Sequence, residues 1–224
     1  MTRARLLAVT TVAAVFLAAA APGFAWGWGA VKGSGKIVSE TRTLDSFDRL
    51  GSAGSATVVV TVGPAQSVTV KADDNVVSLI ETKVENGRLK IGTNGSYSTD
   101  SDVTVTVTVP ALKAAALSGS GDITVTGVGG DSFEAALSGS GDISATGRAE
   151  KVSVSVAGSG DVHLFGLASL RAEVSIAGSG DVEVSATEAL SASIAGSGDV
   201  HYRGKPAVKR SIAGSGDVRP APEP

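Results

Sequence analysis

Residues 172–184 read AEVSIAGSGDVEV, and this stretch decides the fold. Small apolar residues alternate with Glu and Ser on both sides of a Gly-Ser-Gly-Asp segment. Alternation with a period of two is typical of a β-strand that buries one face. Glycine accepts positive φ angles without steric cost, so the Gly-Ser-Gly segment suits a sharp corner. The stretch therefore predicts two short strands joined by a corner.

The same corner recurs six times in the C-terminal half of the chain, each time followed by Ile or Val. The successive aspartates of these corners are 20, 19, 20, 18 and 18 residues apart. A near-constant period of this length is typical of stacked repeats, because one short unit cannot bury its own apolar side. We interpret the corners as structural turns, made of Gly119, Gly121, Asp122, Gly139, Gly141, Asp142, Gly158, Gly160, Asp161, Gly178, Gly180, Asp181, Gly196, Gly198, Asp199, Gly214, Gly216 and Asp217.

The positions around the corners also match from copy to copy. A parallel β-solenoid places equivalent residues directly above one another at a rise of about 4.8 Å, whereas a meander of antiparallel hairpins imposes no such matching. The sequence thus predicts an all-β parallel β-helix with about six rungs of 18–20 residues, and hairpins are the less favoured alternative. The apolar residue five positions before each aspartate is Leu117, Leu137, Val156, Ile176, Ile194 or Ile212.

The first residues have the features of an export signal. Arg3 and Arg5 precede an apolar stretch over residues 6–21, and small residues lead up to Ala25. This order is typical of a secretory signal peptide over residues 1–25, with an uncleaved membrane anchor as the alternative. We expect a flexible lead over 26–36, one domain over 37–219 and a loose tail over 220–224. No segment after the signal peptide is apolar and long enough to be a transmembrane helix.

The domain divides into a strand-rich part over 37–110 and the corner repeats over 111–219. Strands are predicted over 56–62, 67–71, 83–91 and 103–109, with a turn at Asn86-Gly87 and a short helical turn within 74–80. A solenoid that ended in bare valine-rich strands would expose a sheet edge prone to association. We therefore expect the N-terminal part to cap the stack.

Charge and cysteine content exclude several function classes. Without Arg3 and Arg5, the 19 basic residues fall to 17 against 22 acidic residues, which gives a formal charge of −5. No basic run interleaved with aromatic residues is present, so nucleic acid is not an expected partner. The chain has no cysteine and hence no disulfide framework.

Two sets of side chains are candidate ligands for metal ions. Stacked aspartates about 4.8 Å apart repel one another, and turn amides, solvent or cations such as calcium must offset this. The nonapeptide of known calcium-binding solenoids differs from this corner, so we expect no cofactor and keep calcium as the alternative. His163, Glu183 and His201 each lie two residues after a corner aspartate and are expected to point outward. Their side chains suggest zinc binding, a hypothesis less favoured than calcium binding.

The chain resembles the bacterial family of auto-transporter adhesin head GIN domains, exported domains without an assigned function. The resemblance extends from about Gly35 to Arg219. It rests on the segments TLDSFDRL at 43–50 and VTVTVTVPAL at 103–112, on the corners, and on GDVHYRGKP at 198–206. It implies a right-handed parallel β-helix and a role in adhesion, and it brings no catalytic motif.

These observations favour an exported, non-catalytic solenoid that binds a partner in the periplasm or at the cell surface. The partner would be an envelope component, a glycan or a protein. A calcium-stabilised structural protein and a polysaccharide-acting enzyme are the alternatives, but repeats of 18–20 residues leave no room for the long loops that wall a lyase groove. An ice-binding ladder is disfavoured because Glu134, Glu173 and Lys209 interrupt its column of small residues.

Overall fold

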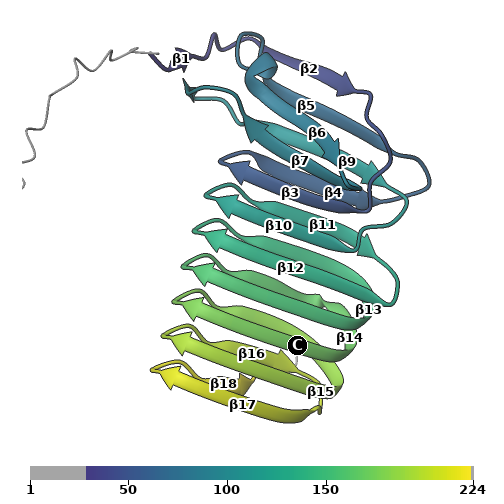
Figure 1. Cartoon of the computed structure of the whole chain (residues 1–224), viewed down its shortest axis with the longest axis vertical. Coiled ribbons are helices and arrows are strands. Elements are labelled where there is room, and N and C mark those ends of the chain that lie inside the picture. The colour runs from purple at the N-terminus through teal and green to yellow at the C-terminus, as the bar shows by residue number, and fades with distance from the viewer. Residues whose placement is uncertain (1–28, 223–224) are drawn as a thin grey trace, which may run out of the picture.

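The computed structural model describes residues 29–222, and these form a flattened coil of stacked β-strands (Figure 1). The only helical element in this range is the 3-10 turn η1 (Val77–Leu79). A strand-rich N-terminal part is followed by about five solenoid turns, where the sequence predicts about six rungs, and the predicted all-β solenoid is confirmed. The repeats comprise β10 (Ala114–Gly119), β11 (Ile123–Val128), β12 (Ser132–Gly139), β13 (Ile143–Gly158), β14 (Val162–Gly178), β15 (Val182–Gly196), β16 (Val200–Arg203), β17 (Ala207–Gly214) and β18 (Val218–Pro220).

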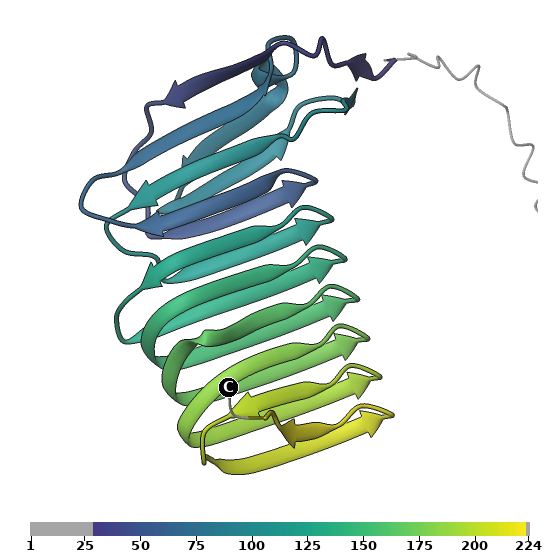
Figure 2. The same ribbon diagram turned by 180° about the vertical axis from the view of Figure 1, so that it is seen from behind.

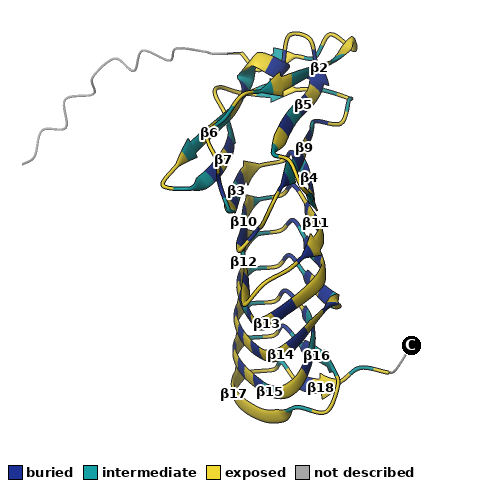
Figure 3. Cartoon of the chain, turned by 90° about the vertical axis from the view of Figure 1, so that its right-hand side faces the viewer, coloured by how far each residue is buried: buried dark blue, intermediate teal, exposed yellow. Residues whose placement is uncertain are grey.

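Each turn contributes one strand to each of two layers, which Figure 3 shows edge-on. The strands that lead into the corners form what we call the first layer: β3 (Arg49–Gly54), β10, β12, the second halves of β13, β14 and β15, and β17. The second layer leaves the corners: β4 (Thr57–Val62), β11, the first halves of β13, β14 and β15, and β16 and β18. All of these pairings are parallel, which confirms the solenoid and excludes the hairpin meander.

The register stacks identical positions of successive turns. Ile176 pairs with Val156 on one side and with Ile194 on the other, and Gly178 pairs in the same way with Gly158 and Gly196. The corners consequently line up along one edge of the molecule (Figure 2). Three strands, β13 to β15, run through the return bend at the opposite edge and so belong to both layers.

The core lies between the two layers and consists mainly of Val, Leu, Ile and Ala. Five of the six predicted inward residues before the corners are at most 2% exposed, from Leu117 to Ile194. The sixth, Ile212, is 37% exposed, because no further turn covers it within the described residues. Burial of these aliphatic side chains stabilises the stack by roughly 25 cal/mol per Å² of apolar surface removed from water.

The N-terminal part contains one more coil than the corner motif reveals. Strands β3 and β4 are joined by Gly54, Ser55 and Ala56, and Gly54 pairs with Gly119 of the first recognised corner. Above this coil, β7 (Arg88–Thr93) pairs with β3, and β9 (Thr104–Val109) pairs with β4, both in parallel. The solenoid thus begins at residue 49, although the chain inserts residues 63–113 before the next coil.

Antiparallel strands close the N-terminal end of the stack, as the capping argument predicts. They are β2 (Ile37–Arg42), β5 (Ser67–Asp73) and β6 (Ile80–Glu85), which pair with β5, β9 and β7. The predicted strands correspond to β4, β5, β6 with β7, and β9, and the predicted helical turn to η1. Asn86 and Gly87 both have positive φ, as a tight hairpin turn requires.

The expected boundaries differ from the structure at both ends. The signal peptide predicted over residues 1–25 lies outside the described residues. Part of the expected flexible lead is fixed, because β1 (Val31–Lys32) pairs with β8 (Tyr97–Ser98) and the Gly35 amide donates to the buried Asp73 carboxylate. At the other end, Pro220 still belongs to β18, and the Ala221 amide donates to the Tyr202 carbonyl.

Candidate binding surface

The corner glycines are fixed by close contact between successive turns. The first glycine of every corner has positive φ, for example 143° at Gly139. A Cβ atom on the second glycine would collide with the corner above it, since it would lie 1.8 Å from the Gly121 carbonyl oxygen at Gly141. Backbone geometry and stacking therefore account for glycine at these positions.

The corner aspartates form a hydrogen-bonded ladder. Each Oδ1 accepts the backbone N–H of the next aspartate along the stack, at distances of 2.7–3.1 Å from Asp122 to Asp217. These charge-assisted bonds offset the repulsion between stacked carboxylates that the sequence implies. The aspartates thus link each turn to the next, in agreement with a structural role, which stays a prediction for the corners.

The outward side of the first layer carries two columns of small residues, which we call the small-residue face. Neighbours in each column belong to adjacent strands in register, so their side chains stand in straight rows. A flat surface results, because no side chain in either column is larger than serine. The columns are Ala116, Ala136, Ser155, Ser175, Ser193 and Ser211, and Ser118, Ser138, Ala157, Ala177, Ala195 and Ala213.

A groove of about 470 Å³ lies at the N-terminal end of this face. Its lining includes Ala136, Ser138 and Ser155 of the small-residue face, together with Arg88 and Lys90 of β7. The hairpin β6–β7 projects beyond the first layer, as Figure 3 shows, and brings these two cations to the groove. We call this feature the hairpin groove.

The two cations of the hairpin groove differ in their partners. Lys90 binds Glu85 across the hairpin, and the hydrogen bond from Lys90 lowers the pKa of the Glu85 carboxyl below its ordinary value. Arg88 has no carboxylate within ion-pair distance among the described residues. The positive charge of Arg88 is therefore available to a ligand in the groove.

The outward side of the second layer brings together the histidine set noted in the sequence. His163 Nδ1 lies 3.1 Å from Glu183 Oε2, while Arg219 Nε donates to His201 Nε2 at 2.9 Å. The zinc hypothesis loses support because Nε2 of His201 already accepts a hydrogen bond from Arg219. Over residues 29–222, no group of three His, Cys, Asp or Glu side chains is placed to hold a metal ion.

One contact on the same side was not predicted, although the repeat alignment contains the information needed to find it. The guanidinium carbon of Arg203 lies 4.1 Å from the centre of the Phe165 ring, a cation–π distance. The two residues are two turns apart in the stack, with Ser185 between them, because Ser185 pairs with Arg203 and its hydroxyl donates to the Phe165 carbonyl. The repeat alignment places all three in one column, which is the signal that finds this contact.

A second hollow, of about 560 Å³, lies at the return bends. The Gly129-Gly130-Asp131 segment forms one side, and Arg148 and Glu150 contribute opposite charges. Since acidic and basic groups both line it, its charge favours no ligand class. The hairpin groove, with its unpaired cation, is the better candidate site.

The fold and these faces define a parallel β-solenoid that presents long, regular surfaces on a rigid stack. The chain belongs to the family described as "Putative auto-transporter adhesin, head GIN domain", whose model matches residues 46–206. Membership of an adhesin family indicates an exported or surface protein and agrees with a non-catalytic module. A search of curated proteins gives no match to this chain.

Solved structures with the same fold come from Bacteroides and Parabacteroides species. A "putative adhesin" from Bacteroides fragilis superposes with a TM-score of 0.70 at 21% identity, covering 85% of this chain and 100% of that chain. Another from Parabacteroides distasonis gives 0.56 at 25% identity, covering 86% and 100%. A "putative lipid binding protein" from the same species gives 0.52 at 26% identity, covering 87% and 100%.

Across residues 29–222, the structure has no helix with the length and apolar character needed to cross a bilayer.

Proposed function

We propose that this protein is an exported, non-catalytic binding module of the cell envelope, and that the hairpin groove holds an extended glycan carrying carboxylate or phosphate groups. The observation that carries the proposal is the position of Arg88 and Lys90 beside a flat floor of Ala and Ser. A floor of small side chains lets a polymer approach the backbone closely, and the serine hydroxyls supply hydrogen-bond donors and acceptors. An arginine guanidinium binds carboxylate and phosphate in a bidentate manner.

The lining of the groove supports binding in preference to catalysis. Among the described residues that line it there is no Asp, Glu, His or Tyr, so a general acid for glycosidic cleavage is missing from its walls. The acidic character of the chain as a whole does not prevent binding of an anion here, because charges farther than about 8 Å are largely screened at physiological salt.

Binding to a glycan array tests the proposal. The full-length mature protein is expected to bind acidic polysaccharides in preference to neutral ones, and binding should weaken as salt is raised. Arg88→Glu should reduce this binding about tenfold or more, because it replaces the free cation with a repelling charge. Ala136→Trp should block the floor, whereas Ser193→Trp, on the same face but outside the groove, serves as the matched control.

Three results would contradict the proposal. Equal binding by wild type and by both groove variants would place the ligand elsewhere. Retention on lipid vesicles in place of glycans would assign the ligand class described for the Parabacteroides relative. Release of shortened or unsaturated sugars from any bound polymer would show that the module is an enzyme.

A further inference from the structure

The last coil of the solenoid is open. Strand β17 pairs only with β15, and β18 pairs only with β16, so the outer edges of both strands have no partner within residues 29–222. In a parallel sheet, alternate residues of such an edge direct their N–H and C=O groups away from the sheet. The open edge therefore offers a row of hydrogen-bonding groups to an additional strand.

The apolar positions of this coil are also uncovered. Val208 and Ile212 occupy the positions of the buried Leu190 and Ile194 one turn above, yet they are 40% and 37% exposed. Figure 3 shows β17 as exposed along its whole length. A further strand laid on β17 would cover both side chains.

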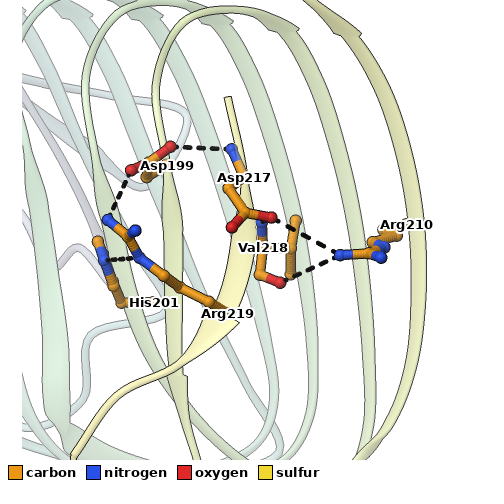
Figure 4. Close-up of polar contacts among 6 residues, drawn as sticks. All are labelled: Asp199, His201, Arg210, Asp217, Val218 and Arg219. Atoms are coloured by element: carbon orange, nitrogen blue, oxygen red, sulfur yellow. Dashed lines mark hydrogen bonds and ion pairs between the residues drawn. The ribbon is translucent and has the colours of Figure 1, made fainter. Parts of the chain in front are cut away.

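The hydrogen-bond pattern of the stack stops at this coil. In each earlier corner, the aspartate Oδ1 accepts the amide of the next aspartate, as Asp199 does from Asp217 (Figure 4). Asp217 has no such neighbour, and its Oδ1 instead accepts the amide of the following Val218. The acceptor that elsewhere links one turn to the next is here used within the last turn.

The charge of this end is opposite to that of the remaining molecule. Residues 200–224 contain five basic residues, Arg203, Lys205, Lys209, Arg210 and Arg219, and two acidic residues, Asp217 and Glu223, for a net charge of +3. Residues 29–199 contain 12 basic and 20 acidic residues, for a net charge of −8. Two such basic ends repel each other, so the charge disfavours pairing with the same end of a second copy and favours an acidic partner.

The side chain of Arg210 also hinders the addition of a further strand at this end. It stands at the inward position that Val174 and Ala192 occupy in the turns above. Its guanidinium reaches across the open end, 3.6 Å from Asp217 Oδ1 and 3.5 Å from the Val218 carbonyl oxygen (Figure 4). An inward charge on an edge strand is a known means of preventing unspecific sheet extension.

We infer that the edge of β17 is a docking site for an acidic, extended segment of a protein partner, which adds as one more strand of the first layer. Alternating apolar residues of that segment would cover Val208 and Ile212, and its acidic residues would face the basic end. A membrane surface fits less well, because a bilayer would leave the unpaired backbone groups of β17 unsatisfied. A site of this kind is separate from the hairpin groove, so either proposal can fail alone.

Synthetic peptides test the inference directly. A labelled peptide in which glutamate and valine alternate over eight residues should bind the full-length mature protein, measured by fluorescence anisotropy. A peptide of the same composition with its glutamates and valines in two blocks should bind much more weakly. Methylation of alternate peptide nitrogens should abolish binding, because it removes the donors that pair with the strand edge.

Charge-reversal variants locate the site. Lys205→Glu together with Lys209→Glu should weaken peptide binding about tenfold or more, since neither lysine has an ion-pair partner among the described residues. Lys71→Glu together with Lys83→Glu makes the same charge change in the N-terminal part and should leave binding unchanged. The far-ultraviolet circular dichroism spectra of both double variants should match that of wild type.

Other outcomes would overturn the inference. Equal affinity for the alternating and block peptides, or tolerance of the methylated peptide, would show a charge contact without strand addition. Flotation with phosphatidylglycerol vesicles, lost in the Lys205→Glu, Lys209→Glu variant, would assign the end to a membrane. A wild-type dimer in sedimentation velocity that excludes the peptide would assign it to a second copy.

Discussion

The residues of each corner have separate physical roles. The first glycine supplies a positive φ angle, and the second supplies the space that the corner above needs. The aspartate supplies an acceptor for the amide of the next turn. Stacking of successive turns therefore explains each residue of the motif, and each residue can be tested separately.

Asp161 separates the acceptor role from the charge. Asp161→Asn keeps an oxygen for the Asp181 amide and removes one of the stacked charges, so we expect stability equal to or slightly above that of wild type. Asp161→Ala leaves that amide without its acceptor and should cost about 1–3 kcal/mol of unfolding free energy. Urea denaturation of the two variants checks this, and equal losses for both would contradict the acceptor role.

At the scale of elements, Asp48 joins three segments. Its backbone N–H donates to Gly87 of the β6–β7 turn, and its carbonyl accepts from Lys113 before β10. Its side chain binds Lys113 Nζ at 2.7 Å, and this hydrogen bond holds the pKa of the Asp48 carboxyl below its ordinary value of 3.8. The hairpin and the first regular coil are thus fixed to the same residue.

The lowered pKa makes this junction dependent on pH. Because the folded pKa lies below the unfolded one, the ion pair stabilises the protein above the unfolded pKa, and this contribution is lost as pH falls through the folded pKa. Asp48→Asn should lose about 0.2–1 kcal/mol at neutral pH, since the side chain is partly exposed, and nothing at a pH below the folded pKa. Urea midpoints measured at both pH values check this, and a loss of equal size at both would contradict it.

The repeats could be predicted from the sequence, because each strand alternates and each corner repeats its glycines. The coil of β3 and β4 could not, because Ala56 and Thr57 replace the Gly-Asp of its corner and an insertion follows it. The hairpin groove was also missed. Arg88 reaches the small-residue face only through the pairing of β7 with β3, two strands that lie far apart in the sequence.

The molecule as a whole has two unlike ends. The N-terminal end is made of antiparallel strands, of which β2 and β6 lie outermost, whereas the C-terminal coil ends in the parallel strands β17 and β18 and is basic. Solenoids that end in matching parallel edges tend to stack into fibres, and the antiparallel edges of β2 and β6 do not match the parallel edges of β17 and β18.

Replacing Arg210 by an apolar residue should promote self-association through the C-terminal end. Arg210→Val places at the inward position the residue found at Val154 and Val174, which lowers the charge and adds apolar surface at the open end. We expect concentration-dependent dimers in sedimentation velocity, without fibres. Arg171→Val, an outward arginine in β14, is the control and should remain monomeric. A strictly monomeric Arg210→Val protein would show that the guanidinium does not limit self-association.

The identical contacts between successive turns have a consequence for the size of the molecule. Since a turn touches only the turns beside it, the gene can gain or lose one copy of 18–20 residues and leave both ends intact. Each copy changes the distance between the hairpin groove and the basic end by about 4.8 Å. The number of repeats would therefore set the distance between the two proposed binding sites.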